Sequence, residues 1–442
     1  MPEYFPENNT PLWSDTEVRS LQKISSSLDS LSSNGSGSII GSFPTDAFGR
    51  LKISSPFTLF DSSHRYRDNG LWSTYIDGTA MATFNQAQGL VDLMIGGEDG
   101  DEITRETTKV FSYQPGKSLL IMSTFVMNEA KINLRQRVGY YGDDNGIYLE
   151  LYGNALSFVE RSLVSGTISE TPVLQSDWNG DKLDGTGPSG ITLDISKAQI
   201  LWMDIEWLGI GTVRAGFVID GKFITCHSFH HANLIQSTYI TTASLPLRYE
   251  IKNVGQPNPN TQSTLKQVCS TVISDGGYQL NGTQQAIGTP IGTPRVLTAK
   301  ETYYPIVSLR LKTTPDRLDA IVILTAASIL PVSSQQTPNF NWRIVASGVT
   351  TAGTWESAGA DSAVEYNITG TAFTGGRILA SGYLSTSNQS ISPTDILKEA
   401  LFKSQLERNG LTGTPYELSL VVAASANSAE VLGSLDWEEI SR

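Results

Sequence analysis

The sequence predicts an all-β protein: two β-sandwich, jelly-roll-like domains in series, with a short helical anchor at the N-terminus and one helix in the second domain. The first observation is a succession of short runs in which apolar and polar residues alternate, or β-branched and aromatic residues gather, as in strands. The second is the set of Gly-, Asn- and Asp-rich turn signals between these runs. The third is composition, because 39% hydrophobic residues are enough for a real core although only 17% are charged. Many short strands joined by such turns favour sandwiches.

Length and charge exclude several classes of function. The chain has 442 residues and a net charge of −13, so we expect two or three domains and no nucleic-acid or membrane partner. The most apolar stretch, 321–330, is too short to cross a bilayer, and the opening Met1-Pro2-Glu3-Tyr4 predicts no secretory signal. Cys226 and Cys269 predict two buried free thiols in a reducing compartment. We expect no cofactor.

Residues 1–42 are predicted to be a segment for attachment and oligomerisation. An extended arm at 1–13 precedes a helix that Ser14 or Asp15 caps. The apolar stripe of this helix follows heptad spacing and consists of Val18, Leu21, Ile24, Leu28 and Leu31. A lone helix of this length is marginal in water. The stripe therefore docks on its own chain or bundles with copies or a partner, and we favour the second alternative.

Residues 43–275 are predicted to form the first domain, a β jelly roll. Its strand-like runs lie at 118–126, 147–151, 156–160, 200–207, 212–219, 222–225, 247–252 and 265–273. Asp220-Gly221 separates GFVI from KFIT and predicts a two-residue hairpin turn.

Residues 276–300 repeat Gly-Thr-Pro and are rich in turn signals, which predicts an interdomain linker. Residues 301–442 are predicted to form the second sandwich, with strands at 306–311, 320–325, 342–346, 363–369, 377–383, 418–423 and 434–438. One helix is expected at about 393–409, because Ser392 can cap it, Pro393 suits its first position and Asn409-Gly410 can end it.

Trp202, Asp204 and Glu206 form the most enzyme-like pattern. On a strand they share one face, and paired carboxylates on one face are what glycoside hydrolysis needs. The segment is similar to the E-x-D-x-E strand of concanavalin-like jelly-roll glycosidases, but Trp202 occupies the nucleophile position and has no carboxylate. The pattern therefore predicts a concanavalin-like architecture more than activity, with a polar face that contacts sugar as the alternative.

Two further clusters have both a metal-binding and a structural interpretation. Closely spaced oxygen donors could bind calcium or could form Asx turns with their own backbone, and they are Asp177, Asn179, Asp181 and Asp184. His227, His230 and His231 adjoin Cys226, but only two of these histidines would share a strand face, whereas zinc takes four ligands. We favour the structural interpretation of both clusters and predict no metal.

The remaining aromatic and basic residues predict no further site. Trp72, Trp178, Trp202 and Trp207 are expected mainly in the core, because each buries a large area, with a surface tryptophan that stacks on sugar as the alternative. Arg135 and Arg137, followed by Tyr140 and Tyr141, are isolated and do not form a basic patch.

Two segments together resemble a family of tailed-bacteriophage virion structural proteins, described as fibre, head-fibre or minor structural proteins. One is FGRLKISSPFTLFD at 48–61, and the other spans 176–233 through SDWNGDKLDGTGPSGITLD, DIEWLG, GFVIDGK and CHSFHHAN. The resemblance covers about 43–275. It implies a non-enzymatic component of a virion, assembled in the bacterial host cytoplasm.

The leading hypothesis is a fibre-like or decorating protein on a head, neck or tail, attached to other virion proteins through its N-terminal segment and homo-oligomeric, with a trimer favoured. The alternative is an adhesin that binds host-surface glycan, or a weak polysaccharide depolymerase, using the face of Asp204 and Glu206. A third interpretation is a monomeric two-domain lectin unconnected with virions.

Overall fold

The computed structural model describes residues 55–279, 281–332, 338–386 and 404–441. Across these residues the regular structure is antiparallel β-sheet, with one 3₁₀ turn, η1 (Gln175–Asp177). The prediction of an all-β protein built of sandwiches is confirmed. The predicted anchor helix and its apolar stripe lie outside the described residues. The described part of the chain contains no helix long and apolar enough to span a membrane.

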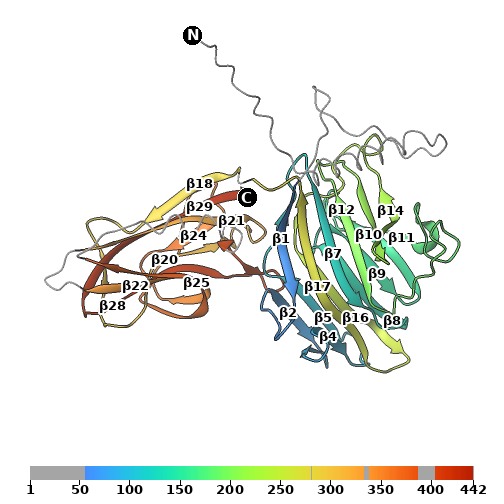
Figure 1. The fold of residues 1–442 in the computed structure, drawn as a ribbon, viewed down its shortest axis with the longest axis horizontal. Helices are drawn as coiled ribbons and strands as arrows, with labels where there is room; N and C mark the ends of the chain where they lie inside the picture. The colour runs from blue at the N-terminus through green and yellow to red at the C-terminus, as the bar shows by residue number, and fades with distance from the viewer. Residues whose placement is uncertain (1–54, 280, 333–337, 387–403, 442) are drawn as a thin grey trace, which may run out of the picture. The chain divides into compact units, whose positions relative to one another are not determined.

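Two sheets form the first sandwich (Figure 1). The strands of the eight-stranded sheet are, in spatial order, β14 (Lys222–Phe229), β13 (Val213–Ile219), β12 (Gln199–Ile205), β7 (Ser118–Val126), β17 (Ser263–Asp275), β4 (Leu90–Ile95) and β3 (Met81–Asn85), with β1 (Pro56–Ser63) paired to β17. The strands of the seven-stranded sheet are β11 (Ser169–Leu174), β10 (Ala155–Ser162), β9 (Gly146–Tyr152), β8 (Ile132–Tyr141), β16 (Leu247–Asn258), β5 (Glu102–Thr107) and β2 (Trp72–Asp77). A two-stranded ladder joins β6 (Phe111–Ser112) to β15 (Ser244–Leu245).

The core of this sandwich forms because successive side chains along a strand point to opposite faces of the sheet. In β7, Leu119, Ile121 and Phe125 are buried while the intervening side chains are half-buried on the outer face. Trp72 and Trp178 belong to the core, and Trp207 packs against it, as the sequence predicts. The side chains between the buried positions of β7 lie on the outer face of the sheet.

The predicted hairpin at Asp220-Gly221 is confirmed. Ile219 pairs with Lys222, and the two turn residues have φ values of 51° and 73°. Two successive positive φ values define the type I′ turn, whose twist matches that of the flanking strands.

The second sandwich has its own core, which includes Phe340, Trp342 and Trp437. The strands of its six-stranded sheet are β23 (Glu356–Ser357), β24 (Val364–Asn367), β20 (Tyr304–Leu311), β28 (Glu417–Ala424), β22 (Asn339–Thr351) and β25 (Ala372–Ser385). The strands of its four-stranded sheet are β18 (Thr283–Gly288), β29 (Ala429–Ser441), β19 (Arg295–Leu297) and β21 (Ile321–Pro331). The apolar stretch 321–330 therefore lies in β21, which extends beyond the strand predicted at 320–325.

The stretch predicted to be a linker, 276–300, instead carries two strands of the second sandwich. β18 and β19 both pair with β29, and Leu297 is fully buried in the core. The Gly-Thr-Pro repeats are the turn that joins these two strands. The partner strand lies at the far end of the chain, so local turn signals could not reveal the pairing.

The predicted helix at about 393–409 is wrong over its last residues. Gln405 forms an isolated bridge with Ile323, and Arg408–Asn409 is a short strand, β26, paired with β27 (Thr414–Pro415). The earlier part of the predicted helix, 393–403, lies outside the described residues. Residues 55–442 belong to one unit, and Arg408 is 3% exposed in it. Its guanidinium contacts the Asp319 carboxylate at 2.9 Å and donates to the Thr107 carbonyl at 2.9 Å. These contacts outweigh the local helical signals.

Candidate functional site

Strand β12 carries only part of the predicted Trp202, Asp204 and Glu206 face. The strand ends at Ile205, so Glu206 lies beyond it and is exposed. Trp202 is 4% exposed and packs edge-on against Phe223, with ring centroids 5.5 Å apart. A tryptophan buried in this way offers no open face to a sugar ring, so the prediction of a three-residue glycan face is wrong in its geometry.

Asp204 is held by an arginine on the neighbouring strand. Its register partner is Arg214, whose Nε lies 3.1 Å from a carboxylate oxygen and whose Nη2 also contacts that oxygen. Burial raises the pKa of the Asp275 carboxyl, and the charge of Asp204 raises it further. The charge of Asp204 therefore acts on Asp275 of β17. A carboxylate that is ion-paired as Asp204 is with Arg214 is a poor nucleophile and a poor proton donor.

The oxygen-rich loop uses its side chains on its own backbone, as the structural interpretation predicts. The Asp181 carboxylate accepts from the backbone N–H of Leu183 at 2.9 Å and of Ser189 at 2.7 Å. Asp184 accepts from the Thr186 N–H at 2.9 Å, while Asn179 exchanges two hydrogen bonds with the Ser228 backbone at 2.8 and 2.9 Å. Asp177 is exposed at the end of η1. Within the described ranges, no three His, Cys, Asp or Glu side chains converge as a metal site would require.

The three neighbouring histidines do not converge either. His231 stacks on Tyr239 with ring centroids 4.0 Å apart and an interplanar angle of 5°. Its Nδ1 lies 2.5 Å from the Gly211 carbonyl oxygen and its Nε2 lies 2.8 Å from the Glu160 carboxylate. His227 packs edge-on against Phe229. These contacts give His227 and His231 a structural role, whereas His230 is exposed, with its Nδ1 3.4 Å from the Thr212 hydroxyl.

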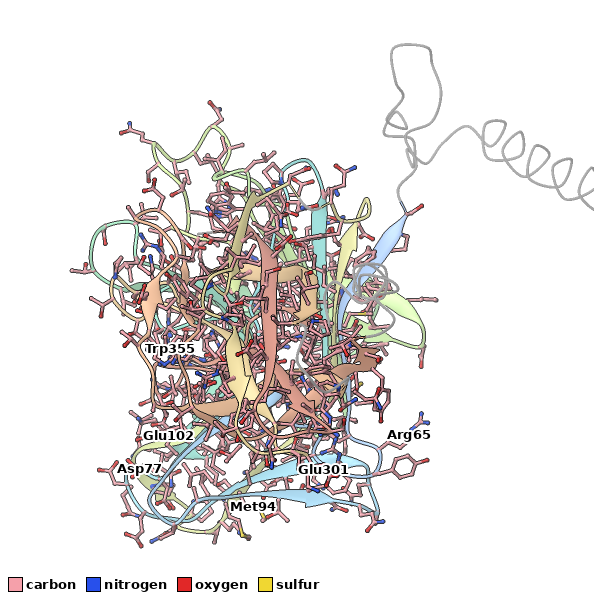
Figure 2. The ribbon with its side chains drawn as sticks, turned by 90° about the vertical axis from the view of Figure 1, so that its left-hand side faces the viewer. Arg65, Asp77, Met94, Glu102, Glu301 and Trp355 are labelled. Atoms are coloured by element: carbon pink, nitrogen blue, oxygen red, sulfur yellow. The ribbon has the colours of Figure 1, made fainter. Side chains whose placement is uncertain are left out.

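The outer face of the seven-stranded sheet carries a dense set of charged and aromatic side chains that the sequence analysis did not bring together. The registers place Glu150 opposite Arg137, and Arg137 opposite Glu250, across three adjacent strands. We define the Arg–Tyr face as the surface formed by Arg135, Arg137, Tyr141, Tyr148, Glu150, Arg161, Glu170, Arg248 and Glu250. A row on the same face runs from Lys252 to Glu102 and Asp77, the last two of which are labelled in Figure 2.

Ion pairs match the charges of the Arg–Tyr face. Arg135, Arg137 and Arg161 pair with acids of the face itself, whereas Arg248 pairs with Glu106 and Asp143 outside it. Arg137 Nε lies 2.6 Å from the Glu150 carboxylate, and its Nη1 lies 3.5 Å from Glu250. Arg161 contacts Glu170 at 2.6 Å, and Glu170 also accepts a 2.8 Å hydrogen bond from the Tyr148 hydroxyl. Burial opposes the charge on Arg137, but the neighbouring acids and phenols, Glu250 first, leave its pKa raised. These ion pairs position one another, and each of Glu150, Glu170 and Glu250 contacts an arginine.

Aromatic rings fill the space between the guanidinium groups. The rings of Tyr141 and Tyr148 are 4.5 Å apart. The Arg161 guanidinium lies 5.6 Å from the first ring centroid and 5.3 Å from the second, within the range of cation–π attraction. Tyr141 is fully buried. The centre of the face is therefore filled by protein side chains, and exposed side chains such as Tyr152 lie at its margin.

A shallow depression of about 480 Å³ lies at that margin. Its lining consists of Tyr152, Asn154, Ala155, Leu156, Leu174, Gln175 and Ser176. Tyr152 is 42% exposed and Leu174 is 45% exposed, so both present apolar surface to solvent. Tyr152 is paired in register with Arg135, whose guanidinium contacts Glu250 at 3.4 Å. An exposed ring beside amide and hydroxyl side chains suits a ligand with both apolar and hydroxyl surfaces.

Comparison with known proteins identifies similar folds only. No protein-family model and no curated protein matches the chain. The carbohydrate recognition domain of Emp47p is 12% identical and covers 53% of this chain and 100% of its own, with a TM-score of 0.33. A Bacteroides ovatus mixed-linkage glucan GH16 protein in complex with a product is 8% identical. The match covers 48% of this chain and 99% of that protein, with a TM-score of 0.34. A protein of unknown function from Shewanella oneidensis MR-1 is 10% identical, covering 61% and 97% with a TM-score of 0.32. Similarity at this level does not bear on activity.

The signal for the Arg–Tyr face is present in the sequence of β8, INLRQRVGYY. Leu134, Val138 and Tyr140 alternate there with Arg135 and Arg137, which is the pattern of a strand with one polar face. Counting that alternation could have found the strand. The acids that pair with the arginines come from β9, β11 and β16, and only the fold brings them together.

Proposed function

We propose that this protein is a non-enzymatic glycan-binding protein whose first sandwich binds a saccharide at the Tyr152 depression. The observation that carries the proposal is the exposed Tyr152 ring, which lies next to the exposed Leu174 in a depression lined otherwise by Leu156 and by small, amide and hydroxyl side chains. A sugar ring has an apolar face that packs on an aromatic ring and hydroxyl groups that bond to amides. The proposal keeps the adhesin function predicted from the sequence but moves the site away from Asp204 and Glu206.

The proposal excludes hydrolysis because no suitable carboxyl pair is present at the places where the sequence predicted one. Retaining glycosidases hold two carboxyl groups about 5–5.5 Å apart, one of them kept protonated by a raised pKa. Asp204 is bound by Arg214, and Glu206 lies beyond the end of the strand. On the Arg–Tyr face, Glu150, Glu170 and Glu250 all contact arginines.

The test measures binding of purified full-length protein to an array of bacterial surface polysaccharides, followed by titration with the best oligosaccharide. We expect Tyr152→Ala to weaken binding about tenfold, which corresponds to about 1.4 kcal/mol. The matched control is Tyr75→Ala, because Tyr75 is 40% exposed on the same sheet face but does not line the depression. Equal losses in the two variants, or release of reducing sugar that Glu206→Gln abolishes, would refute the proposal.

We also propose that the protein serves as a structural component of a tailed-phage virion, a fibre-like or decorating protein. The resemblance of 48–61 and 176–233 to such proteins supports this second function. Residues of the second motif make contacts that stabilise the fold, such as the Arg214–Asp204 ion pair, the Asp220-Gly221 turn and the His231–Glu160 pair. Motif residues that build the fold rather than a reaction centre are typical of a structural protein.

Attachment through the N-terminal segment, as a homo-oligomer, forms part of this second proposal. Deletion of residues 1–42 should abolish incorporation into particles while the purified fragment keeps its β-sheet circular dichroism. Light scattering of the full chain should give a trimer and that of the fragment a smaller species. Normal incorporation of the truncated protein would contradict the attachment assignment.

A further inference from the structure

The second sandwich contains a cavity that neither proposed function uses. The cavity measures about 520 Å³. Its walls come from the turn and strand at 289–298, from Tyr304 at the start of β20, and from the loop between β24 and β25 at 368–371. This volume lies within the range of about 300–1,000 Å³ usual for small-molecule sites.

Arg295 is the charged residue in the lining. It is half-buried, and its Nη2 donates to the Gly370 carbonyl oxygen. Its Nε is buried without a hydrogen-bond partner, and no carboxylate among the described residues forms an ion pair with it. Burial lowers the pKa of the guanidinium, as expected for a cation that has lost water without gaining an anion.

Other arginines of the same sandwich differ from Arg295 in having a matched partner. Arg310 contacts Glu365 at 3.0 Å, and Arg377 contacts Glu407 at 3.0 Å. Arg343 lies 4.0 Å from the centroid of the Tyr303 ring. Arg295 is therefore a cation in a cavity whose side-chain hydrogen bond among the described residues goes to a backbone carbonyl and not to a carboxylate. An anionic ligand would supply the missing charge partner, because guanidinium groups bind carboxylates with charge-assisted hydrogen bonds.

The rest of the lining favours a hydroxylated ligand over a bare oxyanion. Threonine, proline and tyrosine side chains line the cavity, at Thr289, Pro290, Thr293, Pro294, Thr298, Tyr304, Thr369 and Thr371. A free phosphate or sulfate would fill a small part of the space and leave the apolar surfaces of both prolines and Ile368 uncovered. A sugar that carries a carboxylate would cover both kinds of surface.

The cavity walls are held in place before any ligand arrives. The Thr293 N–H donates to the Pro290 carbonyl at 3.0 Å, and the Thr289 N–H donates to the Gly433 carbonyl at 2.9 Å. The Tyr304 hydroxyl lies 2.7 Å from the Thr298 hydroxyl and accepts from the Ala299 N–H at 3.1 Å. A preformed site loses less affinity to ordering of its loops.

We propose that this cavity binds a uronic acid residue, with Arg295 receiving the carboxylate and the threonine-rich wall facing the sugar hydroxyls. The site lies in the second sandwich and does not depend on the Tyr152 depression. The proposal adds an acidic saccharide to the ligands of the chain and assigns its recognition to one residue.

The experiment is calorimetric titration of the full-length protein with trigalacturonate, with neutral maltotriose of the same length, and with inorganic phosphate. We expect trigalacturonate to bind at least tenfold more tightly than either of the others. Arg295→Gln should lose at least tenfold in affinity for trigalacturonate, and Arg295→Lys, which keeps the charge but not the paired donors, should lose less. Arg343→Gln is the matched control, since it removes a half-buried arginine of the same sandwich outside the cavity, and it should leave binding unchanged.

Three results would overturn the proposal. Phosphate that binds as tightly as trigalacturonate would show a site for free oxyanions, and equal binding of maltotriose would show that the carboxylate is not recognised. A loss of trigalacturonate binding in Tyr152→Ala but not in Arg295→Lys or Arg295→Gln would place the acidic sugar on the first sandwich. Thermal melting of each variant checks that it is folded, and Arg295→Lys keeps the test valid if Arg295→Gln does not fold.

Discussion

The His231–Glu160 pair predicts a stability that depends on pH with a definite sign. Both ring nitrogens of His231 face acceptors, the Gly211 carbonyl at 2.5 Å and the Glu160 carboxylate at 2.8 Å. A neutral imidazole has one N–H and can satisfy only one of them, so the arrangement favours the imidazolium. Burial opposes the charge, but the bonds to Glu160 and Gly211 outweigh it and raise the pKa of His231 above its usual 6.5.

The sign follows from linkage. Because the pKa of His231 is higher in the folded than in the unfolded chain, the folded state binds the extra proton between the two values. The stabilisation is fully present below pH 6.5 and is lost as the pH rises through the folded pKa. Its slope approaches about 1.4 kcal/mol per pH unit for one proton.

Glu160→Gln is the informative perturbation, because glutamine keeps the shape and removes the charge. His231 and Glu160 side chains are 7% and 16% exposed, so solvent screens the pair little. Removing a charge-assisted hydrogen bond of this kind should cost about 1.5–3 kcal/mol at pH 6 and much less at pH 9. The matched control is Glu129→Gln, which changes an exposed glutamate of the same sandwich and should alter stability by less than about 0.5 kcal/mol.

The assay is urea unfolding followed by tryptophan fluorescence at pH values from about 5.5 to about 9, where His residues titrate. The difference in free energy of unfolding between wild type and Glu160→Gln should shrink as pH rises. A difference that stays constant across this range, or that grows with pH, would refute the assignment of the imidazolium.

Three other perturbations test the packing of the chain. Glu106→Gln should lower the free energy of unfolding in urea by about 3–5 kcal/mol, because Glu106 is 1% exposed and contacts both Arg248 and Arg408. The control Glu102→Gln should lower it by about 0–1 kcal/mol, because its partner Lys252 is partly exposed. Trp178→Ala should cost about 3–5 kcal/mol, because this 2%-exposed ring packs on Phe158 and Phe217. Cys226 should react with iodoacetamide far more slowly than Cys269 in mass-spectrometric time courses at pH 8, because burial raises the pKa of the Cys226 thiol to about 12.

The local pattern of apolar and turn residues was enough to predict a strand wherever the strand and its turn are neighbours in sequence. The run at 118–126 is β7 residue for residue, and the turn at Asp220-Gly221 sets the pairing of β13 with β14. The strand predicted at 200–207 ends instead at Ile205. The difference of two residues, Glu206 and Trp207, matters because the catalytic interpretation required Glu206 to lie on the strand face.

Pairing between distant segments could not be derived in the same way. Thr283–Gly288 and Arg295–Leu297 resemble loop sequence until β29 pairs with them. Arg408 has a helical context in sequence, but Asp319 and Glu106 hold its side chain. The Arg–Tyr face has the same origin, since Arg137 and Glu250 are far apart along the chain and adjacent across two strands. Buried ion pairs leave little trace in a sequence that has only 17% charged residues.

The two proposed saccharide sites should respond differently to salt. Arg135 beside Tyr152 already contacts Glu250, so a neutral sugar there gains no net charge interaction and its affinity should not change with ionic strength. Arg295 has no matching carboxylate among the described residues, so binding of a uronate adds an ion pair that salt weakens. The net charge of −13 acts in the opposite direction, because it repels the anion at distances beyond the Debye length of about 8 Å in physiological salt. At low salt the repulsion slows association, while the contact at Arg295 governs dissociation. Dissociation rates measured across salt concentrations should therefore show that trigalacturonate leaves the wild-type protein faster as salt rises. Its dissociation rate from Arg295→Gln should not depend on salt. A wild-type dissociation rate that ignores salt would place the anion away from Arg295.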